Sequence, residues 1–368
     1  MKIAIIHDWL ANMGGAERVI LAFHDIFPDA PIYTTVYNPD KLPEEFRKMD
    51  IRTSFIQKFP KAKIKYNMYL PFMPTAFEQF DLSEYDVVLS SSSSCAKGVI
   101  TRPDTLHICY CHTPMRYAWD FYNEYKESAP KWQKRFIPYL MNYIRMWDRL
   151  SADRVDYFIA NSNEVAKRIK KYYRRESVVI NPPVNVDFYT PVDEDGDYFL
   201  IVSRLVEYKR IDIAVEAFND LGLPLIIIGD GPEKRKLQRM AKSNIKFLGR
   251  LSDEEVKEYY ARCRAFIFPG EEDFGITPVE AQASGRPVIA FGKGGVLDSV
   301  IDGVTGIYFK EQTKESLCEA VIKFNNKFFD KNIIRENAER FDVKNFKTKI
   351  YNVILEKYEN FEKFRGEI

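Results

Sequence analysis

Residues 2–27 read KIAIIHDWLANMGGAERVILAFHDIF, and this stretch decides the fold. Residues 2–6 form a short, apolar, β-branched run, which predicts a buried strand. Gly14 and Gly15 follow the run, and residues 16–27 then carry apolar side chains at helical spacing. A strand, a glycine loop and a helix in this order are typical of the unit from which parallel α/β sheets are built.

The same order returns in the second half of the chain. Residues 198–202 predict a strand, residues 211–221 a helix, and residues 224–228 a second strand before a Gly-Asp-Gly-Pro turn. Because strands alternate with helices over short connections, we expect an α/β protein with two doubly wound, Rossmann-like domains that face each other across a cleft. The other strands that we expect cover residues 86–90, 106–111, 157–160, 245–248, 265–268 and 287–290.

The boundary between the two domains is expected within residues 181–197, which are rich in proline and acidic side chains and have no apolar periodicity. We therefore predict an N-terminal domain over residues 1–190 and a C-terminal domain over residues 196–344. Residues 345–368 have a helical, aromatic pattern. This terminal helix is expected to close the second domain or to cross back onto the first.

Composition limits the possible classes of protein. The 368 residues contain 54 basic and 53 acidic side chains, so the net charge of +1 gives no global argument for binding nucleic acid. Hydrophobic residues make up 46% of the chain, which excludes an intrinsically disordered protein. The odd number of cysteines, five, favours free thiols in a reducing compartment. Without a C-x-x-C pair, the sequence offers few ligands for a zinc site.

The first ten residues do not resemble a secretion signal, because His7 and Asp8 interrupt a short apolar run. Apolar runs elsewhere are far below the roughly 18 residues of a membrane span. We therefore expect a cytoplasmic protein, either soluble or peripheral on the inner face of the cell membrane.

Residues 272–280, EDFGITPVE, are the strongest candidate site. Two carboxylates, Glu272 and Glu280, stand eight positions apart around a glycine and a predicted helix start, where Thr277 fits the N-cap. In one interpretation the window is structural, and Glu280 completes a capping box. In the other, backbone amides at the helix start face an anion while the carboxylates accept hydrogen bonds from sugar or ribose hydroxyls. This window alone leaves both open.

Cations and glycines follow other predicted strands. Arg204 comes directly after one strand and Lys209 opens the next helix, and two such cations suit a diphosphate. The alternative is a solvated loop with ordinary surface charges. In the first half, Gly14 and Gly15 would let the backbone approach a ligand closely. A tight turn with no ligand is the alternative there.

A fourth candidate is the loop at residues 110–120. His112 leaves a predicted strand and enters a polar, aromatic segment. A single histidine is more often structural than catalytic. With Arg116, Trp119 and Asp120 nearby, however, the loop could form a wall on which an acceptor sugar stacks.

These elements, in this order, resemble the retaining glycosyltransferases of family 4 (group 1), which have the two-domain GT-B architecture. The resemblance covers nearly the whole chain and includes residues 158–162, 181–187, 228–232 and 247–251. Residues 110–119 resemble the branch that contains bacterial O-antigen mannosyltransferases. The resemblance therefore implies GDP-mannose as the donor.

The resemblance also implies a role for each matching residue. Arg204 and Lys209 would grip the donor diphosphate, Glu280 would bind the ribose and Glu272 the transferred sugar. His112 would lie near that sugar in an orienting role. The other donor contacts that it implies are the amides of Phe274, Gly275 and Ile276, the backbone of Gly14 and Gly15, and Arg250 with Leu251 beside the base.

The implied activity is retaining, metal-independent transfer of a hexose to a growing, lipid-linked surface oligosaccharide, in polysaccharide biosynthesis. Breaking the sugar–phosphate bond places negative charge on the departing diphosphate, which cations and amides stabilise. No metal cofactor is expected, and no general base is needed if the leaving phosphate accepts the acceptor's proton. Residues 193–195 match the D-x-D metal–nucleotide signature of another glycosyltransferase architecture, and we interpret them as solvated charge in the linker.

Two segments combine aromatic and basic side chains and could lie on anionic lipid. The alternative for both is a stripe that faces the core, with solvated cations around it, and Pro138 interrupts the second segment. The first contains Lys58, Lys61, Lys63, Lys65, Tyr66, Tyr69, Phe72 and Phe77. The second contains Lys131, Trp132, Lys134, Arg135, Phe136, Leu140, Tyr143, Arg145, Trp147, Arg149 and Leu150.

Other functions remain open. A UDP-sugar could replace GDP-mannose as the donor. A glycosidase could use Glu272 and Glu280 as its pair of carboxylates. A non-catalytic protein could bind the sugar nucleotide without turning it over. Nucleic acid is not expected as a partner, because the sequence contains no recognition motif for it.

Overall fold

The computed structural model describes residues 1–194 and 196–366, and the chain forms two compact units. The first unit runs from Met1 to Asn181 and includes the chain again from Phe346 onward, and the second unit runs from Pro182 to Asn345. The break after Asn181 falls at the start of the predicted linker. Asp195 of the acidic run and residues 367–368 of the predicted terminal helix lie outside the described residues.

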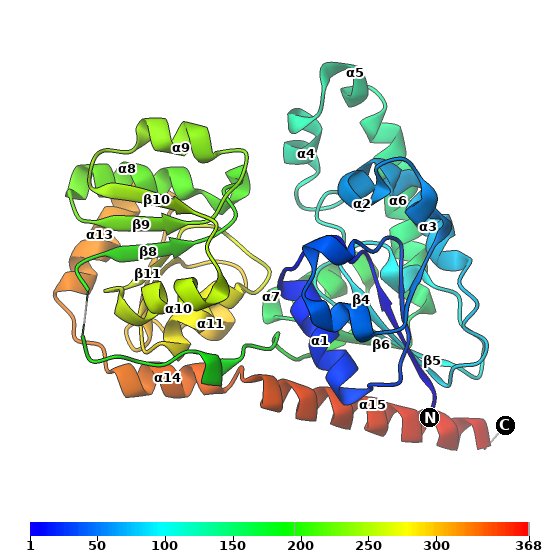
Figure 1. The fold of residues 1–368 in the computed structure, drawn as a ribbon. Helices are drawn as coiled ribbons and strands as arrows, with labels where there is room; N and C mark the ends of the chain where they lie inside the picture. The colour runs from blue at the N-terminus through cyan, green and yellow to red at the C-terminus, as the bar shows by residue number, and fades with distance from the viewer. Residues whose placement is uncertain (195, 367–368) are drawn as a thin grey trace. The chain divides into compact units, whose positions relative to one another are not determined.

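The first unit is built on a seven-stranded parallel sheet in the order β3-β2-β1-β4-β5-β6-β7 (Figure 1). The central strands β1, β4 and β5 are buried along their whole length, as expected for strands covered on both faces. The strands are β1 (Ile3–His7), β2 (Ile32–Thr34), β3 (Ile51–Thr53), β4 (Val87–Ser92), β5 (Leu106–Cys111), β6 (Tyr157–Ala160) and β7 (Ser177–Val179).

Helices cover the sheet of the first unit. The α-helices are α1 (Gly15–Ile26), α2 (Ala62–Lys65), α3 (Met73–Glu78), α4 (Tyr122–Ser128), α5 (Lys131–Lys134), α6 (Ile137–Ser151), α7 (Asn163–Arg168) and the terminal α15 (Val343–Gly366). In α15, Phe346 packs against Phe23 of α1 and Tyr110 of β5, and Lys347 forms an ion pair with Asp25 at 2.6 Å. These contacts attach the terminal helix to the first unit.

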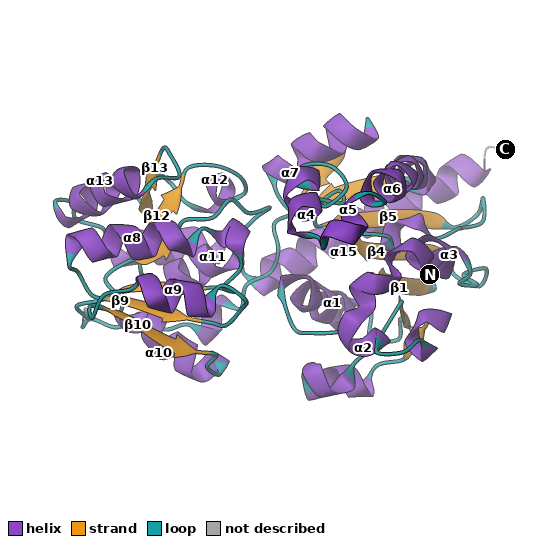
Figure 2. Ribbon diagram, turned by 90° about the horizontal axis from the view of Figure 1, so that it is seen from above, coloured by secondary structure: helices purple, strands orange, loops and turns teal. Residues whose placement is uncertain are grey.

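The second unit contains a six-stranded parallel sheet in the order β10-β9-β8-β11-β12-β13. Figure 2 shows helices on both sides of it. The strands are β8 (Phe199–Val202), β9 (Leu225–Ile228), β10 (Ile245–Gly249), β11 (Phe266–Phe268), β12 (Val288–Phe291) and β13 (Gly306–Phe309). The α-helices are α8 (Ile211–Leu221), α9 (Lys234–Met240), α10 (Asp253–Arg262), α11 (Ile276–Ala283), α12 (Val296–Ser299), α13 (Lys314–Asn325) and α14 (Lys331–Glu339).

Two apolar clusters hold the second unit together, one on each face of its sheet. Phe199 and Ile201 of β8 belong to one cluster, whereas Leu200 between them belongs to the other. This alternation follows from the period of two in a strand, and apolar side chains on both faces explain why the strand sequences are continuously apolar.

The predicted α/β class with two doubly wound parallel sheets is confirmed. All predicted strands are present, with ends that differ by no more than a residue or two. The sequence analysis missed β2, β3, β7 and β13. The first three contain only three residues each, too few to show a periodic pattern, and β13 begins with a glycine.

Candidate functional site

Each sheet has one point at which the strand order reverses. In the second unit this switch point lies between β8 and β11, which are neighbours in the sheet although two strands separate them in the sequence. Ligands of open α/β sheets bind beyond the carboxyl ends of the strands at such a point. The loops that follow β8 and β11 carry Arg204, Lys209 and Glu272, so the topology selects the same loops as the sequence.

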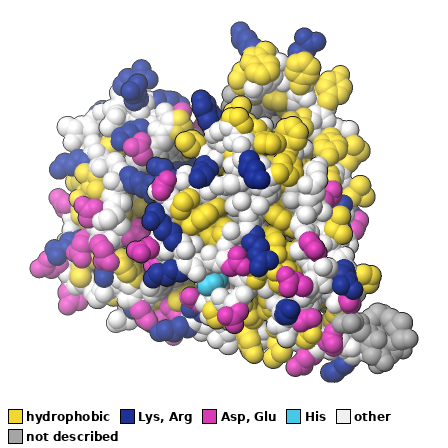
Figure 3. Space-filling model, turned by 45° about the vertical axis from the view of Figure 1, so that its right-hand side comes forward, with side chains coloured by type: hydrophobic (Ala, Val, Ile, Leu, Met, Phe, Trp, Pro, Cys, Tyr) yellow, Lys and Arg dark blue, Asp and Glu magenta, His cyan; other side chains and the backbone are white. Residues whose placement is uncertain are grey.

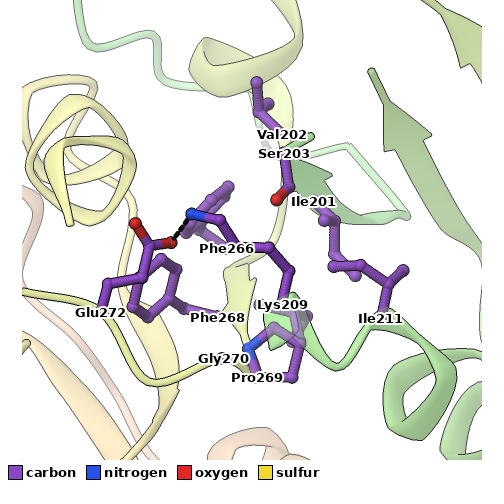
Figure 4. Close-up of a pocket in the computed structure, with 11 residues that line it drawn as sticks. Ile201, Val202, Ser203, Lys209, Ile211, Phe266, Phe268, Pro269, Gly270 and Glu272 are labelled. Carbon is purple, nitrogen blue, oxygen red and sulfur yellow. Dashed lines mark ion pairs between the residues drawn. The ribbon is translucent and has the colours of Figure 1, made fainter. Parts of the chain in front are cut away.

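Lys209 and Glu272 form an ion pair at this switch point. Their side chains are only 14% and 20% exposed, so the pair is partly desolvated. Figure 4 shows the ammonium and the carboxylate pointing toward each other above a small pocket. The pocket is lined by Ile201, Val202, Ser203, Lys209, Ile211, Phe266, Ile267, Phe268, Pro269, Gly270 and Glu272.

The backbone places Lys209 beside the end of β11. Lys209 ends a short 3₁₀ helix (Glu207–Lys209), and Arg210 then adopts a left-handed conformation before α8. A Cβ atom on Gly270 would lie 3.0 Å from both the Cα and the carbonyl oxygen of Lys209. Glycine at position 270 therefore lets the loop after β11 approach the backbone of Lys209 closely.

The loop that carries Arg204 rests on the predicted Gly-Asp-Gly turn. A Cβ on Gly229 would overlap the carbonyl oxygen of Ser203, and a Cβ on Gly231 would overlap that of Leu205. The Arg204 side chain itself is exposed and has no ion-pair or hydrogen-bond partner among the described residues. Arg204 does not line the pocket. The glycine turn supports the backbone of its loop, and its guanidinium remains exposed and available for a ligand.

The start of α11 differs from the prediction. The N-cap is Gly275, with φ +86°, and the cap has no side-chain hydrogen bond, so Thr277 lies inside the helix. The predicted Thr277 N-cap is wrong, and the capping box does not form. A left-handed glycine turns the chain into the helix before threonine is reached. Glu280 is 5% exposed and accepts a hydrogen bond from the Tyr260 hydroxyl at 3.0 Å.

A second glycine loop supports the acidic loop, and the sequence analysis missed it. Gly295 donates its backbone N–H to the carbonyl oxygen of Glu272 at 2.8 Å. A Cβ on Gly295 would overlap the backbone of Asp273 and Phe274. The available signal was the Gly-Lys-Gly-Gly run directly after β12.

The other donor residues of the resemblance lie around this edge in different environments. The Phe274 side chain is buried against Phe341, so only its backbone can face a ligand. Arg250 is exposed and Leu251 is half-buried, and both follow β10. Neither lines the pocket beside Lys209, and their predicted role at the base stays a prediction.

The first unit has its switch point between β1 and β4, and polar side chains meet there. His7 ends β1, Ser91 lies on β4, and His112 directly follows β5. The Ser91 hydroxyl lies 2.8 Å from Nε2 of His112 and 3.2 Å from Nδ1 of His7. Nε2 of His7 lies 3.6 Å from a carboxylate oxygen of Glu17. Burial, followed by the neighbouring His7, lowers the pKa of His112 to about 3.

Gly14 and Gly15 lie beside this group, but the tight turn offered as the alternative is absent. Gly14 is the N-cap of α1, with φ −159°, and neither glycine has a positive φ. A Cβ on Gly14 would lie 3.0 Å from Oε2 of Glu17. A positive φ therefore does not explain the paired glycines, and their predicted close approach to a ligand stays a prediction.

The residues predicted to form an acceptor wall have partners within the first unit. The Trp119 ring stacks on Tyr172 and donates its Nε1–H to buried Asp148 at 2.7 Å. Asp120 forms an ion pair with Arg168 at 2.9 Å, and the Arg116 guanidinium lies over a phenyl ring. These contacts fix the shape of the loop, and its role toward an acceptor stays a prediction.

Comparison with known proteins identifies the family. Residues 13–188 match the model described as Glycosyltransferase Family 4, and residues 186–341 match that described as Glycosyl transferases group 1. The chain belongs to these glycosyltransferases. The predicted family is thereby confirmed. The crystal structure of Anabaena HepE in complex with UDP is similar in fold to this glycosyltransferase, with a TM-score of 0.72, 18% identity, and coverage of 97% of this chain and 100% of that one.

Curated relatives match parts of the chain. An uncharacterised glycosyltransferase of Methanocaldococcus jannaschii is 28% identical over 54% of this chain. O-antigen chain mannosyltransferase C of Escherichia coli is 32% identical over 39%, and a GDP-mannose-dependent alpha-mannosyltransferase of Corynebacterium glutamicum is 39% identical over 29%. The matches span 58%, 42% and 26% of those proteins' own lengths, so the chain covers less than two thirds of each.

Across residues 1–194 and 196–366, no group of three His, Cys, Asp or Glu side chains in this glycosyltransferase is arranged to hold a metal ion. In the linker, Glu194 is 84% exposed and contacts Arg262 at 3.3 Å, as expected for solvated charge. Over the same residues, no helix combines the length and the apolar character needed to span a bilayer.

The two basic, aromatic segments of this glycosyltransferase are partly core and partly surface. Pro138 lies in the first turn of α6 and so separates α5 from α6 instead of interrupting a helix. Trp147 is buried and Leu140 packs on the core, so these two members of the predicted stripe face inward. The large apolar side chains that remain exposed are Trp132, Phe136, Tyr139, Tyr143, Met146 and Leu150 on α5–α6, with Ile64, Met68 and Phe72 on the other segment.

Proposed function

We propose that this glycosyltransferase transfers mannose from GDP-mannose, with retention of configuration and without a metal ion, to a lipid-linked surface oligosaccharide. One observation carries the proposal: Lys209 and Glu272 form a partly buried ion pair at the switch point of the second unit. A cation that can bind phosphate and a carboxylate that can accept a hydrogen bond from a sugar hydroxyl are thereby held next to each other. The names of the Escherichia coli and Corynebacterium glutamicum relatives support mannose, GDP-mannose and an O-antigen type of acceptor.

The geometry supports this chemistry through the leaving group. Cleavage of the sugar–phosphate bond leaves negative charge on the diphosphate, and preorganised cations lower the energy of that state. Lys209 is held in place before the donor arrives, and Arg204 has a free guanidinium that can bind two phosphate oxygens. The first backbone amides of α11, from Ile276 onward, add the positive end of a helix.

The acidic residues have the complementary task. Glu272 is paired with Lys209 but is still 20% exposed, so its second oxygen can accept a hydrogen bond from a sugar hydroxyl. Glu280 is buried against Tyr260, and we assign it to the ribose hydroxyls. The leaving phosphate accepts the proton of the acceptor hydroxyl, so no side chain has to act as a base.

A UDP-sugar is the second candidate donor, because the similar Anabaena structure contains UDP. Thermal-shift measurements with GDP, UDP and ADP sugars separate these donors, since a ligand that binds the native state raises its apparent stability. We expect the largest shift with GDP-mannose. A larger shift with UDP-glucose would assign the enzyme to UDP-sugars.

Transfer is then measured with radiolabelled GDP-mannose and a lipid-linked acceptor in excess EDTA. We expect labelled glycolipid with the anomeric configuration of the donor. Strict dependence on an added divalent metal would contradict the metal-free mechanism. Release of free sugar from an oligosaccharide without nucleotide would indicate a glycosidase, and binding without turnover would indicate a sensor.

We also propose that the exposed residues of α5 and α6 bind an anionic membrane surface, where a lipid-linked acceptor is found. Trp132 is 68% and Tyr139 is 78% exposed, and Lys131 and Arg135 flank them. In Figure 3, hydrophobic side chains gather with Lys and Arg beside them over the part of the first unit that carries α4 to α6. Aromatic rings at the headgroup level and cations beside anionic lipid both favour binding.

Flotation with phosphatidylglycerol and phosphatidylcholine vesicles tests this surface. We expect flotation with the anionic vesicles at low salt, weaker flotation at high salt, and loss of binding in Trp132→Ala/Phe136→Ala. Phe328→Ala in the second unit is the matched control, because Phe328 is 86% exposed outside this surface. Equal flotation of all variants, or none for the wild type at low salt, would contradict the proposal.

A further inference from the structure

The hydrogen bonds around Ser91 determine which nitrogen of His112 carries a hydrogen. Nδ1 of His7 lies 3.3 Å from the main-chain carbonyl oxygen of Ser91 and 3.2 Å from its hydroxyl oxygen. A carbonyl oxygen can only accept, so Nδ1 of His7 must be the donor. This assignment holds whether His7 is neutral or protonated, since Nδ1 carries a hydrogen in both cases.

The Ser91 hydroxyl must then be the donor in its hydrogen bond with His112. Its hydroxyl is fully buried, and His7 already donates toward it. Within the part of the chain that the structure describes, Nε2 of His112, at 2.8 Å, is the one remaining group in contact with that hydroxyl. A buried hydroxyl without an acceptor costs about 1–3 kcal/mol, so the hydrogen points at Nε2.

Nε2 of His112 is therefore an acceptor, and a neutral ring carries its hydrogen on Nδ1. The ring is neutral at physiological pH because burial lowers the pKa of His112 to about 3. Among the described residues, the side-chain hydrogen bond of His112 is the one from Nε2 to Ser91, and Nδ1 has none. The first unit thus presents an unused N–H donor at the carboxyl end of its sheet.

We propose that Ser91, itself oriented by His7, is a positioning residue that holds His112 as the Nδ1–H tautomer, so that His112 acts as a hydrogen-bond donor and not as a base. The tautomer follows from the hydrogen bonds alone, while the consequence for catalysis rests on the function proposed above. Toward a sugar, such a donor contacts hydroxyl or ring oxygens. Glu17 lies 3.6 Å from Nε2 of His7, beyond hydrogen-bond distance, so the hydrogen bonds of His7 that bear on the proposal are those of its Nδ1 to Ser91.

The neighbouring serine supplies a matched control. Ser90 precedes Ser91 on β4 and its side chain points to the opposite face of the sheet. The Ser90 hydroxyl lies 2.8 Å from Nε2 of His107, which is fully buried. Ser90→Ala therefore removes a serine–histidine contact of the same length from the same strand without touching His112.

The direct test is a long-range ¹H–¹⁵N spectrum of the imidazole rings, which distinguishes the two neutral tautomers. The protein contains four histidines, and His112→Asn identifies the signals of His112. The spectrum is recorded without donor or acceptor, so its outcome does not depend on the proposed function. We expect the Nδ1–H tautomer in the wild type and in Ser91→Thr, which keeps the hydroxyl. The Nε2–H tautomer in the wild type would overturn the proposal.

The variants test the part played by Ser91. In Ser91→Ala we expect His112 to change to a mixture of tautomers, whereas in Ser90→Ala only the signals of His107 should change. An unchanged His112 tautomer in Ser91→Ala would overturn the role of Ser91. If transfer is observed, Ser91→Ala should lower kcat roughly fivefold with little change in KM, and Ser91→Thr should restore it. If transfer is absent but the spectra are as expected, the proposed function fails and the tautomer stands.

Discussion

The two switch points use different chemistry. In the second unit, charged groups meet where β8 and β11 end: Lys209 is paired with Glu272, and Arg204 is exposed. In the first unit, the groups that meet where β1 and β4 end are His7, Ser91 and His112, and the pKa of His112 is too low for it to carry charge. The difference indicates a division of work. On the function proposed above, the second unit would stabilise developing charge, whereas the first would supply neutral hydrogen bonds that orient the sugar.

The largest expected effect comes from removing the cation of the second unit. Lys209→Ala should lower kcat by about 100- to 1,000-fold, because on the proposed function it removes a preorganised cation that faces the leaving phosphate. The fold should persist, since Lys209 lies in the loop after β8, outside the strands of the sheet. Steady-state kinetics measure the loss of kcat, and the midpoint of thermal unfolding shows whether the fold persists. Lys314→Ala is the control, because Lys314 forms an exposed ion pair with Asp220 in the same unit. Equal activity of the two variants would show that the charge of Lys209 has no role in catalysis.

A smaller effect is expected from moving Lys209 without removing it. The added methyl group in Gly270→Ala would meet the Lys209 backbone at 3.0 Å, so the lysine must shift by a few tenths of an ångström. We expect kcat/KM to fall roughly tenfold, since catalysis is sensitive to small displacements. A double-mutant cycle gives the cause: Gly270→Ala should add little in the Lys209→Ala background. Additive losses would mean that Gly270 acts on something other than Lys209.

Replacing the neutral donor of the first unit should have a weaker effect than Lys209→Ala. His112→Ala removes one hydrogen bond, with a net value of about 1 kcal/mol, so kcat/KM should fall roughly five- to tenfold. His112→Asn, whose amide can place an N–H near the position of Nδ1, should retain more activity than His112→Ala. If kcat/KM fell as far in His112→Ala as in Lys209→Ala, the proposed difference in role between the two sheet edges would be wrong.

The two edges also differ in how far sequence predicts them. Lys209 and Glu272 each lie a few residues beyond an apolar strand, so the predicted strand ends already place both at the same edge of the sheet, where the structure pairs them. His7 and Ser91 are 84 positions apart and meet only because β1 and β4 pair in parallel with these residues in register. Local patterns contain no information on that register. The visible signals were a histidine at the end of β1 and the serine run at the end of β4.

Capping shows a second limit. Gly275 and Thr277 are both good cap residues, and sequence chose the threonine. The structure uses the glycine, because its left-handed backbone turns the chain from the acidic loop into α11 two residues earlier. Propensity alone could not decide between the two residues, because the start of the helix also depends on the path of the acidic loop, which packs closely against the backbone of Gly294 and Gly295.

The last prediction concerns stability instead of activity and tests whether the buried His107 of the first unit is held neutral. Burial lowers the pKa of His107 to about 4, below the value of roughly 6.5 in an unfolded chain. Between these values the unfolded state binds more protons, so stability is complete above about pH 6.5 and is lost as the pH falls toward 4, by at most ~1.4 kcal/mol per pH unit for this group. Urea unfolding of His107→Gln should therefore depend less on pH over this range than that of the wild type. Parallel curves for the two proteins would show that His107 is not held neutral.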